Sequence, residues 1–185
     1  MRRGNIFSAA TDILDLDTFT MYHELIPSAL SSVRPRCREY LFLHHPTCLF
    51  ALETTTLYSM SSLEICVRCR HRAIGPGEIH GLVGSSVAVP RSDLEMLQAL
   101  ELDFSVAVSQ RVSTPSILLG IARFLNHDCN PNAQLVRVTR QSWIVKATRS
   151  IAVGEEITVD YGNHYFGIDN HECACASCSH TRAAY

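Results

Sequence analysis

Four cysteines constrain the fold of this chain more than any other feature of its sequence. Cys173, Cys175 and Cys178 lie close together near the C-terminus, and Cys129 lies well before them in a polar turn. Three thiolates need a fourth ligand to complete the tetrahedral geometry of a structural metal site, and Cys129 can supply it. We therefore predict that one metal ion joins these two stretches and fixes how the chain folds between them.

Zinc is the expected metal, because soft thiolates in a tetrahedral site with no position left for water favour structural zinc. The eight cysteines could instead pair as disulfides in a secreted protein. The chain has no signal-peptide pattern, however, and the CxCxxC spacing is more typical of metal binding. Three nearby histidines could each replace a thiolate: His164, His171 and His180. A site of four cysteines is the simpler assignment.

The other cysteines are expected to have no metal. Cys66 and Cys69 form a CxxC in a strand-like stretch, but no second pair lies nearby, so a structural or coincidental role is favoured. Cys37 and Cys48 are expected to be reduced thiols.

The composition predicts one domain with an appendage. With 185 residues, of which 46% are hydrophobic and 18% charged, the chain can bury one sizeable core. The formal net charge of -2 argues against a phosphate-binding surface, so no sequence-specific nucleic acid binding is expected. No apolar run is long enough to span a bilayer, so we expect an intracellular protein with no membrane partner.

The pattern of apolar residues predicts a mainly β fold with short helices, preceded by a helical segment. Apolar residues recur at helical spacing from Thr11 to Val33, and Pro27 should kink this helix. After Tyr40 threonine and β-branched residues become frequent, which favours short strands. We expect an N-terminal helical segment at 1–39, a β-rich domain at 40–162 and a zinc-binding segment at 163–185.

Within the β-rich domain, strands are expected at 48–53, 57–59, 63–68 and 103–108, with a hairpin formed by 133–138 and 143–147. Ser92 to Glu95 has the form of a capping box that opens a short helix. Ser113-Thr114-Pro115 is expected to start a helical turn that continues to Phe124.

One short pattern, R-x-I-x-x-G-E, occurs twice, at 72–78 and at 149–155. The glycine can adopt a positive φ in a tight turn, while the isoleucine can anchor the turn in the core. Two similar turns, each leading into a strand, are therefore expected.

The turn around Cys129 also contains Asn126 and His127. Taken alone, such a pair most often satisfies backbone groups in a polar turn, and a single Tyr161 would also be ordinary. If the metal joins the two stretches, these three residues come to the same place, where a catalytic or cofactor site can form.

Three motifs, in this order, resemble the SET-domain lysine methyltransferases that have a post-SET zinc loop: RFLNHDCNPN at 123–132, GEEITVDYG at 154–162 and CACASC at 173–178. Four stretches further resemble the subgroup that methylates lysine 20 of histone H4, particularly its fungal members: 53–59, 103–109, 113–132 and 161–178. The resemblance covers about Tyr40 to His180. It implies the SET β-fold with its pseudo-knot, in which the segment ending at Tyr161 threads beneath the loop containing Asn126, a topology that is otherwise rare.

The resemblance implies a pocket for S-adenosylmethionine. Asn126 and His127 are expected at its adenosine end, and Phe166 with Cys175 over the adenine. Many SET domains have a glycine-rich GxG in this region, whereas this chain has residues 56–60 without glycine. The subgroup that it resembles shares this departure. The full set of expected cofactor contacts is Tyr58, Ser59, Ala122, Arg123, Phe124, Asn126, His127, Tyr161, Phe166 and Cys175.

The implied reaction is in-line transfer of a methyl group to a neutral lysine amine, in which alignment contributes most of the acceleration. A lysine has an ordinary pKa of about 10.4, so desolvation and the cofactor cation must favour its neutral form. Tyr161 is the expected catalytic residue, because its hydroxyl can orient the amine and stabilise the polarised methyl. Phe104, Tyr165 and Phe166 are expected to line an apolar lysine channel, with Ser105 at its end.

The stretch between Ser150 and His180 contains no Lys or Arg, and five acidic residues lie in it: Glu155, Glu156, Asp160, Asp169 and Glu172. Such runs are usually solvated surface, but beside Tyr161 they would attract a basic tail. With the resemblance, this predicts a nuclear, chromatin-associated enzyme that methylates the histone H4 tail at lysine 20 on nucleosomes. The motifs also fit a SET enzyme for another histone or non-histone lysine, and a zinc-stabilised module that binds histones without catalysis.

Overall fold

The structure is a computed structural model, and it describes residues 41, 47–55, 64–100, 106–109, 112–139, 142–163 and 165–183. The chain divides into two units, 1–48 and 49–185, and the architecture below is that of the second. Two predicted elements lie outside the described residues, the N-terminal helix at 11–33 and the strand at 57–59. Four predicted site residues also lie outside them: Tyr58, Ser59, Phe104 and Ser105.

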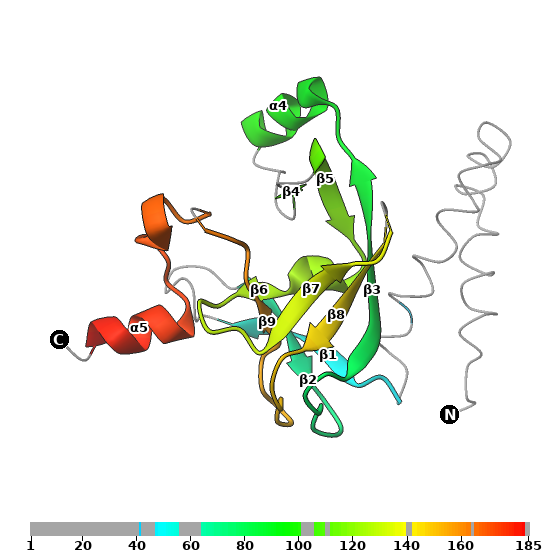
Figure 1. Ribbon diagram of the computed structural model, residues 1–185, viewed down its shortest axis with the longest axis vertical. Coiled ribbons are helices and arrows are strands. Elements are labelled where there is room, and N and C mark those ends of the chain that lie inside the picture. Colours follow the sequence, from blue (N-terminus) through cyan, green and yellow to red (C-terminus); the bar gives the residue numbers. More distant parts are fainter. Residues whose placement is uncertain are drawn as a thin grey trace, which may run out of the picture. The chain divides into compact units, whose positions relative to one another are not determined.

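The second unit is mainly β, as predicted, and its strands form three small sheets (Figure 1). A hairpin pairs β1 (Phe50–Thr55) with β2 (Glu64–Cys69). An antiparallel sheet of five strands has the order β4-β5-β3-β8-β7. Its members are β3 (Ile79–Ala88), β4 (Val106–Ser109), β5 (Val112–Leu119), β7 (Ala133–Arg137) and β8 (Ser142–Ala147). The third sheet is a short parallel pair, β6 (Asn126–His127) and β9 (Thr158–Val159).

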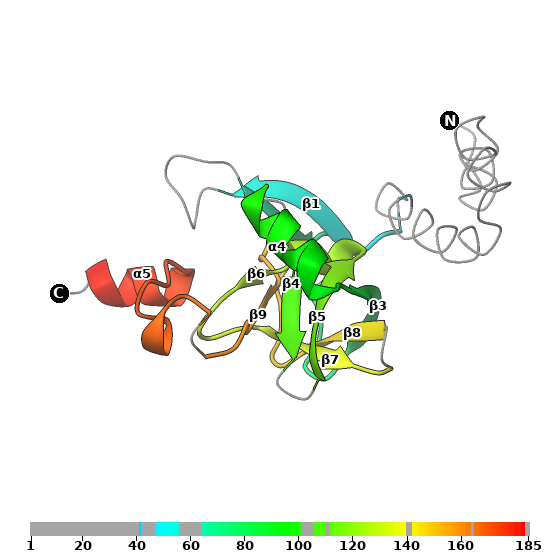
Figure 2. The same ribbon diagram turned by 90° about the horizontal axis from the view of Figure 1, so that it is seen from above.

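Four helical segments complete the described part: α4 (Arg91–Ala99), η1 (Ile121–Phe124), η2 (Ile168–Asn170) and α5 (Ala176–Ala183). Along the horizontal direction that Figures 1 and 2 share, β6 and β9 lie between α5 and β3. The C-terminal segment therefore adjoins the parallel pair, on the side away from β3. No helix in the described stretches has the length and apolar character needed to span a membrane.

The predicted hairpin at 133–147 is confirmed by the antiparallel pairing of β7 with β8. Val145 and Ala147 are buried while Lys146 is exposed, so side chains alternate between core and solvent. Trp143 donates its Nε1–H to Ser86 Oγ at 3.1 Å, which joins β8 to β3 through side chains as well as backbone. The alternation in the sequence was therefore sufficient to predict this hairpin.

One local prediction in this region is wrong. Residues 113–119 belong to β5 instead of starting a helix, and the helical turn is confined to Ile121–Phe124. Pro115 is tolerated inside β5 because the register with β4 shifts between Ala107 and Ser109, and an irregular ladder can accommodate a residue without an N–H.

The predicted capping box is also absent. Helix α4 begins at Arg91 with Pro90 as its N-cap, and no side chain caps it. Ser92 donates instead to Asp93 Oδ1 at 3.0 Å. The fixed φ of proline already suits a helix start, so the helix begins before the serine that the sequence pattern favoured.

The two R-x-I-x-x-G-E segments form similar turns, as predicted, and they also pair with each other. Ile74 and Ile151 form an isolated antiparallel bridge with both N–H···O distances at 2.9 Å, and both side chains are buried. Gly77 and Gly154 have φ angles of 76° and 82°, which the absence of a Cβ permits. Two segments that are distant in the sequence thus pair with each other and contribute buried isoleucines to the core.

Glu155 stabilises the second of these turns. Its carboxylate accepts hydrogen bonds from Arg149 Nη1 at 2.7 Å and from the Ala152 amide at 2.9 Å. Burial opposes its charged form, but the Ala152 amide, Asn132 and Arg149 together lower the pKa of Glu155 below its ordinary value of 4.5. Glu78 repeats the arrangement in the first turn with Arg72 and Gly75.

A pH-dependent prediction follows for Glu155→Gln. The folded carboxyl has a depressed pKa, so its stabilisation is present above the unfolded pKa and is lost as pH falls through the folded pKa. At pH 7 we expect the free energy of unfolding of this variant to be about 1 kcal/mol lower than that of the unsubstituted chain. This difference should shrink below pH 4.5. Urea unfolding of both proteins from pH 7 downward measures it, with Glu95→Gln on exposed α4 as the control. A difference that grows in acid would contradict the assignment.

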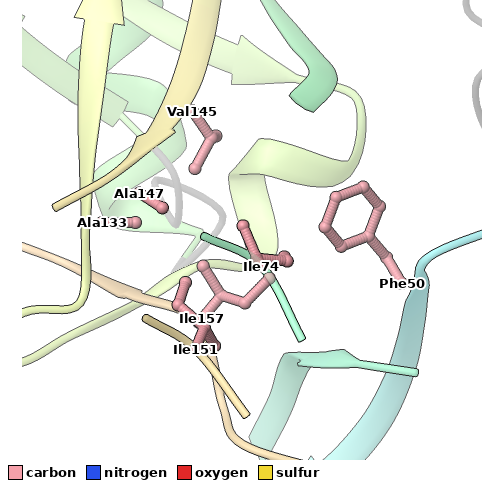
Figure 3. A pocket seen from close by; sticks show the side chains of 7 residues that line it. All are labelled: Phe50, Ile74, Ala133, Val145, Ala147, Ile151 and Ile157. Carbon is pink, nitrogen blue, oxygen red and sulfur yellow. The ribbon is translucent and has the colours of Figure 1, made fainter. Parts of the chain in front are cut away.

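The core of the second unit lies where the two R-x-I-x-x-G-E turns meet the five-stranded sheet. Figure 3 shows seven apolar side chains converging on a void of about 10 Å³: Phe50, Ile74, Ala133, Val145, Ala147, Ile151 and Ile157. A space this small with no polar lining does not hold a stable water molecule. It is an imperfection of core packing and offers no ligand site.

Asn132 joins the loop after β6 to the segment that enters β9. It is 1% exposed, donates Nδ2–H to Glu155 Oε1 at 3.0 Å and to the Glu156 carbonyl at 2.7 Å, and accepts from the Thr158 amide at 2.9 Å. With the parallel pairing of β6 and β9, these bonds bring together the two segments that are expected to thread past each other. The side-chain amide of Asn132 therefore has a structural role, because it joins these two segments in the interior.

Asn132→Ala should lower the free energy of unfolding by about 2–4 kcal/mol, because it leaves a buried amide and a buried carbonyl without their partner. Chemical denaturation measures this directly. Gln134→Ala, at an exposed position of β7, should change stability by no more than about 0.5 kcal/mol. Equal effects of the two substitutions on the free energy of unfolding would show that the hydrogen bonds of Asn132 do not stabilise the fold.

Candidate functional site

The candidate site is built on the short turn η1 and on β6, which follows it. Gly120 precedes η1, whose residues Ile121 and Ala122 are buried, and Leu125 directly after η1 is buried as well. These apolar anchors fix the direction of the backbone, so Asn126 and His127 pair with β9 instead of remaining in a free loop. The parallel pair then continues directly to Tyr161.

The side-chain amide of Asn126 is held by two acceptors. Its Nδ2 donates to the Ile65 carbonyl at 3.2 Å and to Glu156 Oε1 at 2.9 Å. No described residue donates to Oδ1 of Asn126. The amide is thus fixed on its nitrogen side, and its carbonyl oxygen is left to meet a ligand.

His127 in β6 is buried, and its ring lies beside the cysteine cluster. Its Nδ1 accepts the Tyr161 amide hydrogen at 3.1 Å, and its Nε2 lies 3.4 Å from Cys129 Sγ. Since Nδ1 accepts, the hydrogen of the neutral ring is on Nε2 and faces the thiol. Burial lowers the pKa of His127 despite the nearby Asp160 and Asp128 carboxylates, which is consistent with a neutral ring.

Tyr161 lies at the end of β9 in a group of aromatic rings. Its hydroxyl donates to the Leu125 carbonyl at 2.5 Å, while 39% of the residue is exposed. The ring of Tyr165 packs edge-on against it at 4.8 Å, and that of Phe166 is stacked at 6.3 Å. Burial of the hydroxyl raises the pKa of Tyr161 well above its ordinary value, so the hydroxyl stays protonated at physiological pH.

The predicted cysteines gather beside His127. Cys129 Sγ lies 3.9 Å from Cys173 Sγ and 3.5 Å from Cys178 Sγ. A tetrahedral zinc with Zn–S bonds of about 2.3 Å requires S–S separations of about 3.8 Å, so these distances fit. Potential ligand atoms of His127, Cys129, Cys173 and Cys175 lie within 4.8 Å of one another. The cluster can therefore hold a zinc ion.

Backbone amides also donate to the sulfur of Cys175. Its Sγ accepts the amide hydrogens of Cys129 at 3.4 Å and Cys178 at 3.5 Å. Burial would raise the pKa of Cys175, but these amides lower it below its ordinary value. Burial and neighbouring thiols raise the pKa values of Cys129 and Cys173. Metal binding must displace those protons, so the affinity should fall in acid.

Hydrogen bonds that involve no metal also join the C-terminal segment to the loop that follows β6. The buried Asp128 carboxylate accepts from Ser177 Oγ at 2.5 Å and, through the same oxygen, from the Asn130 amide at 2.8 Å. Sequence reasoning missed this pair. The position of Ser177 between two of the predicted metal-binding cysteines was the available signal, because a buried carboxylate in this turn needs a partner from the segment brought beside it.

The remaining predicted residues have varied positions. Ala122 is buried in η1, and the Arg123 guanidinium lies 5.5 Å from the Phe124 ring, so this pair packs along the turn. Phe166 is brought to the site, with its ring 5.2 Å from that of His127. His171 is exposed and is not in the cluster of potential ligands.

The acidic stretch is less uniformly charged than its sequence suggested. Glu155 pairs with Arg149 at 2.7 Å, and Glu156 lies 4.0 Å from Arg68 while bonding to Asn126. Asp160, Asp169 and Glu172 are exposed. Three of the five acids are thus exposed to solvent in the stretch that contains Tyr161.

The buried CxxC remains apart from the metal cluster. Cys66 and Cys69 are buried free thiols of β2, and burial raises the pKa of each. The Cys69 thiol donates to the Arg72 carbonyl at 2.9 Å. Within the described part of the chain, neither belongs to a group of potential metal ligands.

Comparison with known proteins agrees with this geometry. The profile of the SET domain family matches residues 9–162. The chain therefore belongs to the SET-domain family. It is 40% identical over 177 residues to the histone-lysine N-methyltransferase set9 of Emericella nidulans, covering 94% of this chain and 28% of that protein.

Two further relatives have the same name. The proteins of Aspergillus fumigatus and Gibberella zeae are 44% and 40% identical over 146 residues, which covers 78% of this chain and 23% and 22% of theirs. The chain thus spans less than a third of the length of these relatives. A solved structure from Plasmodium falciparum matches 63% of this chain and 96% of its own with a TM-score of 0.48 and 19% identity.

Proposed function

We propose that this chain has S-adenosylmethionine-dependent protein-lysine methyltransferase activity. The observation that carries the proposal is the Tyr161 hydroxyl, held at 2.5 Å on the Leu125 carbonyl, in a SET-family chain whose Asn126 and His127 follow Leu125 directly. SET-domain methyltransferases use S-adenosylmethionine, which supplies a methyl group on a sulfonium. The same short segment thus positions both the proposed cofactor contacts and the proposed catalytic hydroxyl.

The proposed cofactor site surrounds η1 and β6. Asn126 offers a fixed carbonyl oxygen, and Phe166 lies against His127, where it can cover a bound adenine. Cys175 holds the chain just beyond Phe166 through the cysteine cluster. The further proposed contacts are Tyr58, Ser59, Ala122, Arg123, Phe124 and Tyr161.

Tyr161 is proposed to act on the lysine amine. Its O–H is committed to the Leu125 carbonyl, so the oxygen's lone pairs can accept an N–H of the amine and orient the nitrogen for in-line attack. The raised pKa keeps the tyrosine neutral, and a neutral phenol does not favour the protonated lysine as a phenolate would. Tyr165 and Phe166, together with Phe104 and Ser105, are the proposed walls of the lysine channel.

The cysteine cluster is proposed to bind one structural zinc through Cys129, Cys173, Cys175 and Cys178. The S–S distances and the amide hydrogen bonds to Cys175 support this set. His127 is proposed to stay outside the metal's coordination, because Nδ1 accepts from Tyr161 and Nε2–H faces Cys129. The imidazole would then donate to a zinc-bound thiolate and connect the metal to the backbone of the catalytic tyrosine.

The proposed substrate is lysine 20 of histone H4 in nucleosomes, and the proposed location is nuclear chromatin. The similar proteins are named histone-lysine N-methyltransferases, and a histone substrate implies such a location. The exposed acids Asp160, Asp169 and Glu172, in the same stretch as Tyr161, support attraction of a basic tail. This attraction should weaken as salt rises.

The test is transfer of labelled methyl groups to nucleosomes, followed by mass spectrometry of each histone. Label on histone H4 at lysine 20, and its loss when that lysine is replaced by arginine, is the expected result. Label confined to histone H3 would reject the H4 assignment and retain the reaction. Absence of label on nucleosomes, separate histones and other lysine-containing proteins, with cofactor bound, would reject the activity.

A further inference from the structure

We infer that Glu156 is a positioning residue that fixes the side-chain amide of Asn126 for cofactor binding. This inference rests on the proposed function, in which Asn126 contacts S-adenosylmethionine. It concerns a residue that is expected only to contribute negative charge when the sequence is considered alone.

The hydrogen bonds determine which way the Asn126 amide faces. An asparagine amide can place either its NH2 or its oxygen toward a neighbour, but a carboxylate and a backbone carbonyl only accept. Nδ2 of Asn126 lies 2.9 Å from Glu156 Oε1 and 3.2 Å from the Ile65 carbonyl. Both amide hydrogens are thereby used, and Oδ1 is left as the group that a ligand meets. Asn126 would therefore recognise a hydrogen-bond donor of the cofactor.

Backbone hydrogen bonds fix the positions of the two residues that accept from Asn126, Glu156 and Ile65. The segment around Glu156 pairs with β2 on either side, through Cys69 N–H to the Glu155 carbonyl at 3.0 Å and Ile157 N–H to the Val67 carbonyl at 2.8 Å. Ile65 belongs to the same strand. The Glu156 side chain is only 10% exposed, so it has little freedom to turn away.

The guanidinium of Arg68 lies near the other oxygen of the Glu156 carboxylate. Its Nη2 lies 4.0 Å from Glu156 Oε2, while its Nε binds Glu53 at 3.1 Å and its Nη1 donates to the Gly154 carbonyl at 3.0 Å. The arginine is thus fixed by groups other than Glu156. A charged acceptor orients an amide more firmly than a neutral one.

The test is a double-mutant cycle read by calorimetric binding of S-adenosylhomocysteine to the purified chain. Asn126→Ala should weaken binding by about 10- to 50-fold and Glu156→Gln by about 5-fold, since Gln can present either face of its own amide. If Glu156 acts through Asn126, the double variant should bind within about 2-fold of Asn126→Ala. Turnover of Glu156→Gln at saturating cofactor should stay within about 3-fold of the unsubstituted chain.

Glu155→Gln is the matched control, because the neighbouring acid bonds to Arg149 and Asn132 and not to Asn126. It should leave cofactor affinity within about 2-fold. Metal content and thermal unfolding of every variant establish that it is folded.

Three results would overturn the inference. Unchanged binding by Glu156→Gln, while Asn126→Ala weakens it, would reject the positioning role alone. Multiplicative losses in the double variant would show that Glu156 acts independently of Asn126. Unchanged binding by Asn126→Ala would reject the proposed cofactor contact as well.

Discussion

Tyr161→Phe should reduce the turnover of methyl transfer by about 100- to 1000-fold, the loss typical of removing one preorganised polar group at a reacting centre. The substitution removes the hydroxyl that donates to the Leu125 carbonyl at 2.5 Å. It keeps the ring that packs against Tyr165 and Phe166. Cofactor affinity should therefore change by less than about 3-fold. Single-turnover kinetics with labelled cofactor, alongside calorimetric binding, separates the two quantities.

Tyr165→Phe is the control for this prediction, because it removes a hydroxyl from the neighbouring, exposed aromatic residue. It should retain turnover within about 10-fold if that ring only lines the lysine channel. Asn126→Ala should show the opposite pattern, with cofactor affinity lost first. Nearly full turnover by Tyr161→Phe would show that the hydroxyl is not catalytic.

Removal of the metal is expected to have the second large effect. Elemental analysis should find one zinc per chain, and structural zinc sites in small peptides contribute about 10–16 kcal/mol of apparent binding free energy. Cys175→Ser should lose the ion, because it replaces a thiolate that two backbone amides orient. The segment containing Phe166 should then loosen, and cofactor affinity should fall by more than about 10-fold.

Cys69→Ser is the matched substitution outside the cluster. Its side chain bonds to the Arg72 carbonyl, a contact that serine can preserve, so this variant should retain its zinc. Hydrogen exchange of 165–183 provides a second readout, and protection there should fall only in Cys175→Ser. A chain that lacks zinc after gentle purification, or that binds cofactor equally well after chelation, would contradict the proposed role of the metal.

His127 shows why the two predictions are connected. Its ring bonds on one side to the Tyr161 backbone and on the other faces Cys129. Loss of the metal should therefore disturb the position of Tyr161 as well as the C-terminal segment. This coupling could not be deduced from the sequence, in which His127 was expected to serve only the cofactor.

The family, the mainly β character and the cysteines that gather into the cluster could be predicted from residue types and their spacing. These features depend on residue type and spacing: alternating apolar residues predict strands, and thiols at CxCxxC spacing predict a metal site. The hairpin of β7 and β8 could be predicted because its pairing is local. The twin R-x-I-x-x-G-E turns could be predicted for the same reason, but not their pairing with each other.

Features that depend on a partner distant in the sequence could be identified only in the folded chain. Residues 113–119 became a strand because β3 and β4 supply ladders on both sides, which outweigh the local preference for a helical turn at Pro115. Asn132 became a buried tie, and Glu156 was placed between Asn126 and Arg68 instead of on an acidic surface. Local sequence specifies which hydrogen-bonding groups a residue has, but chain topology specifies which partner reaches them.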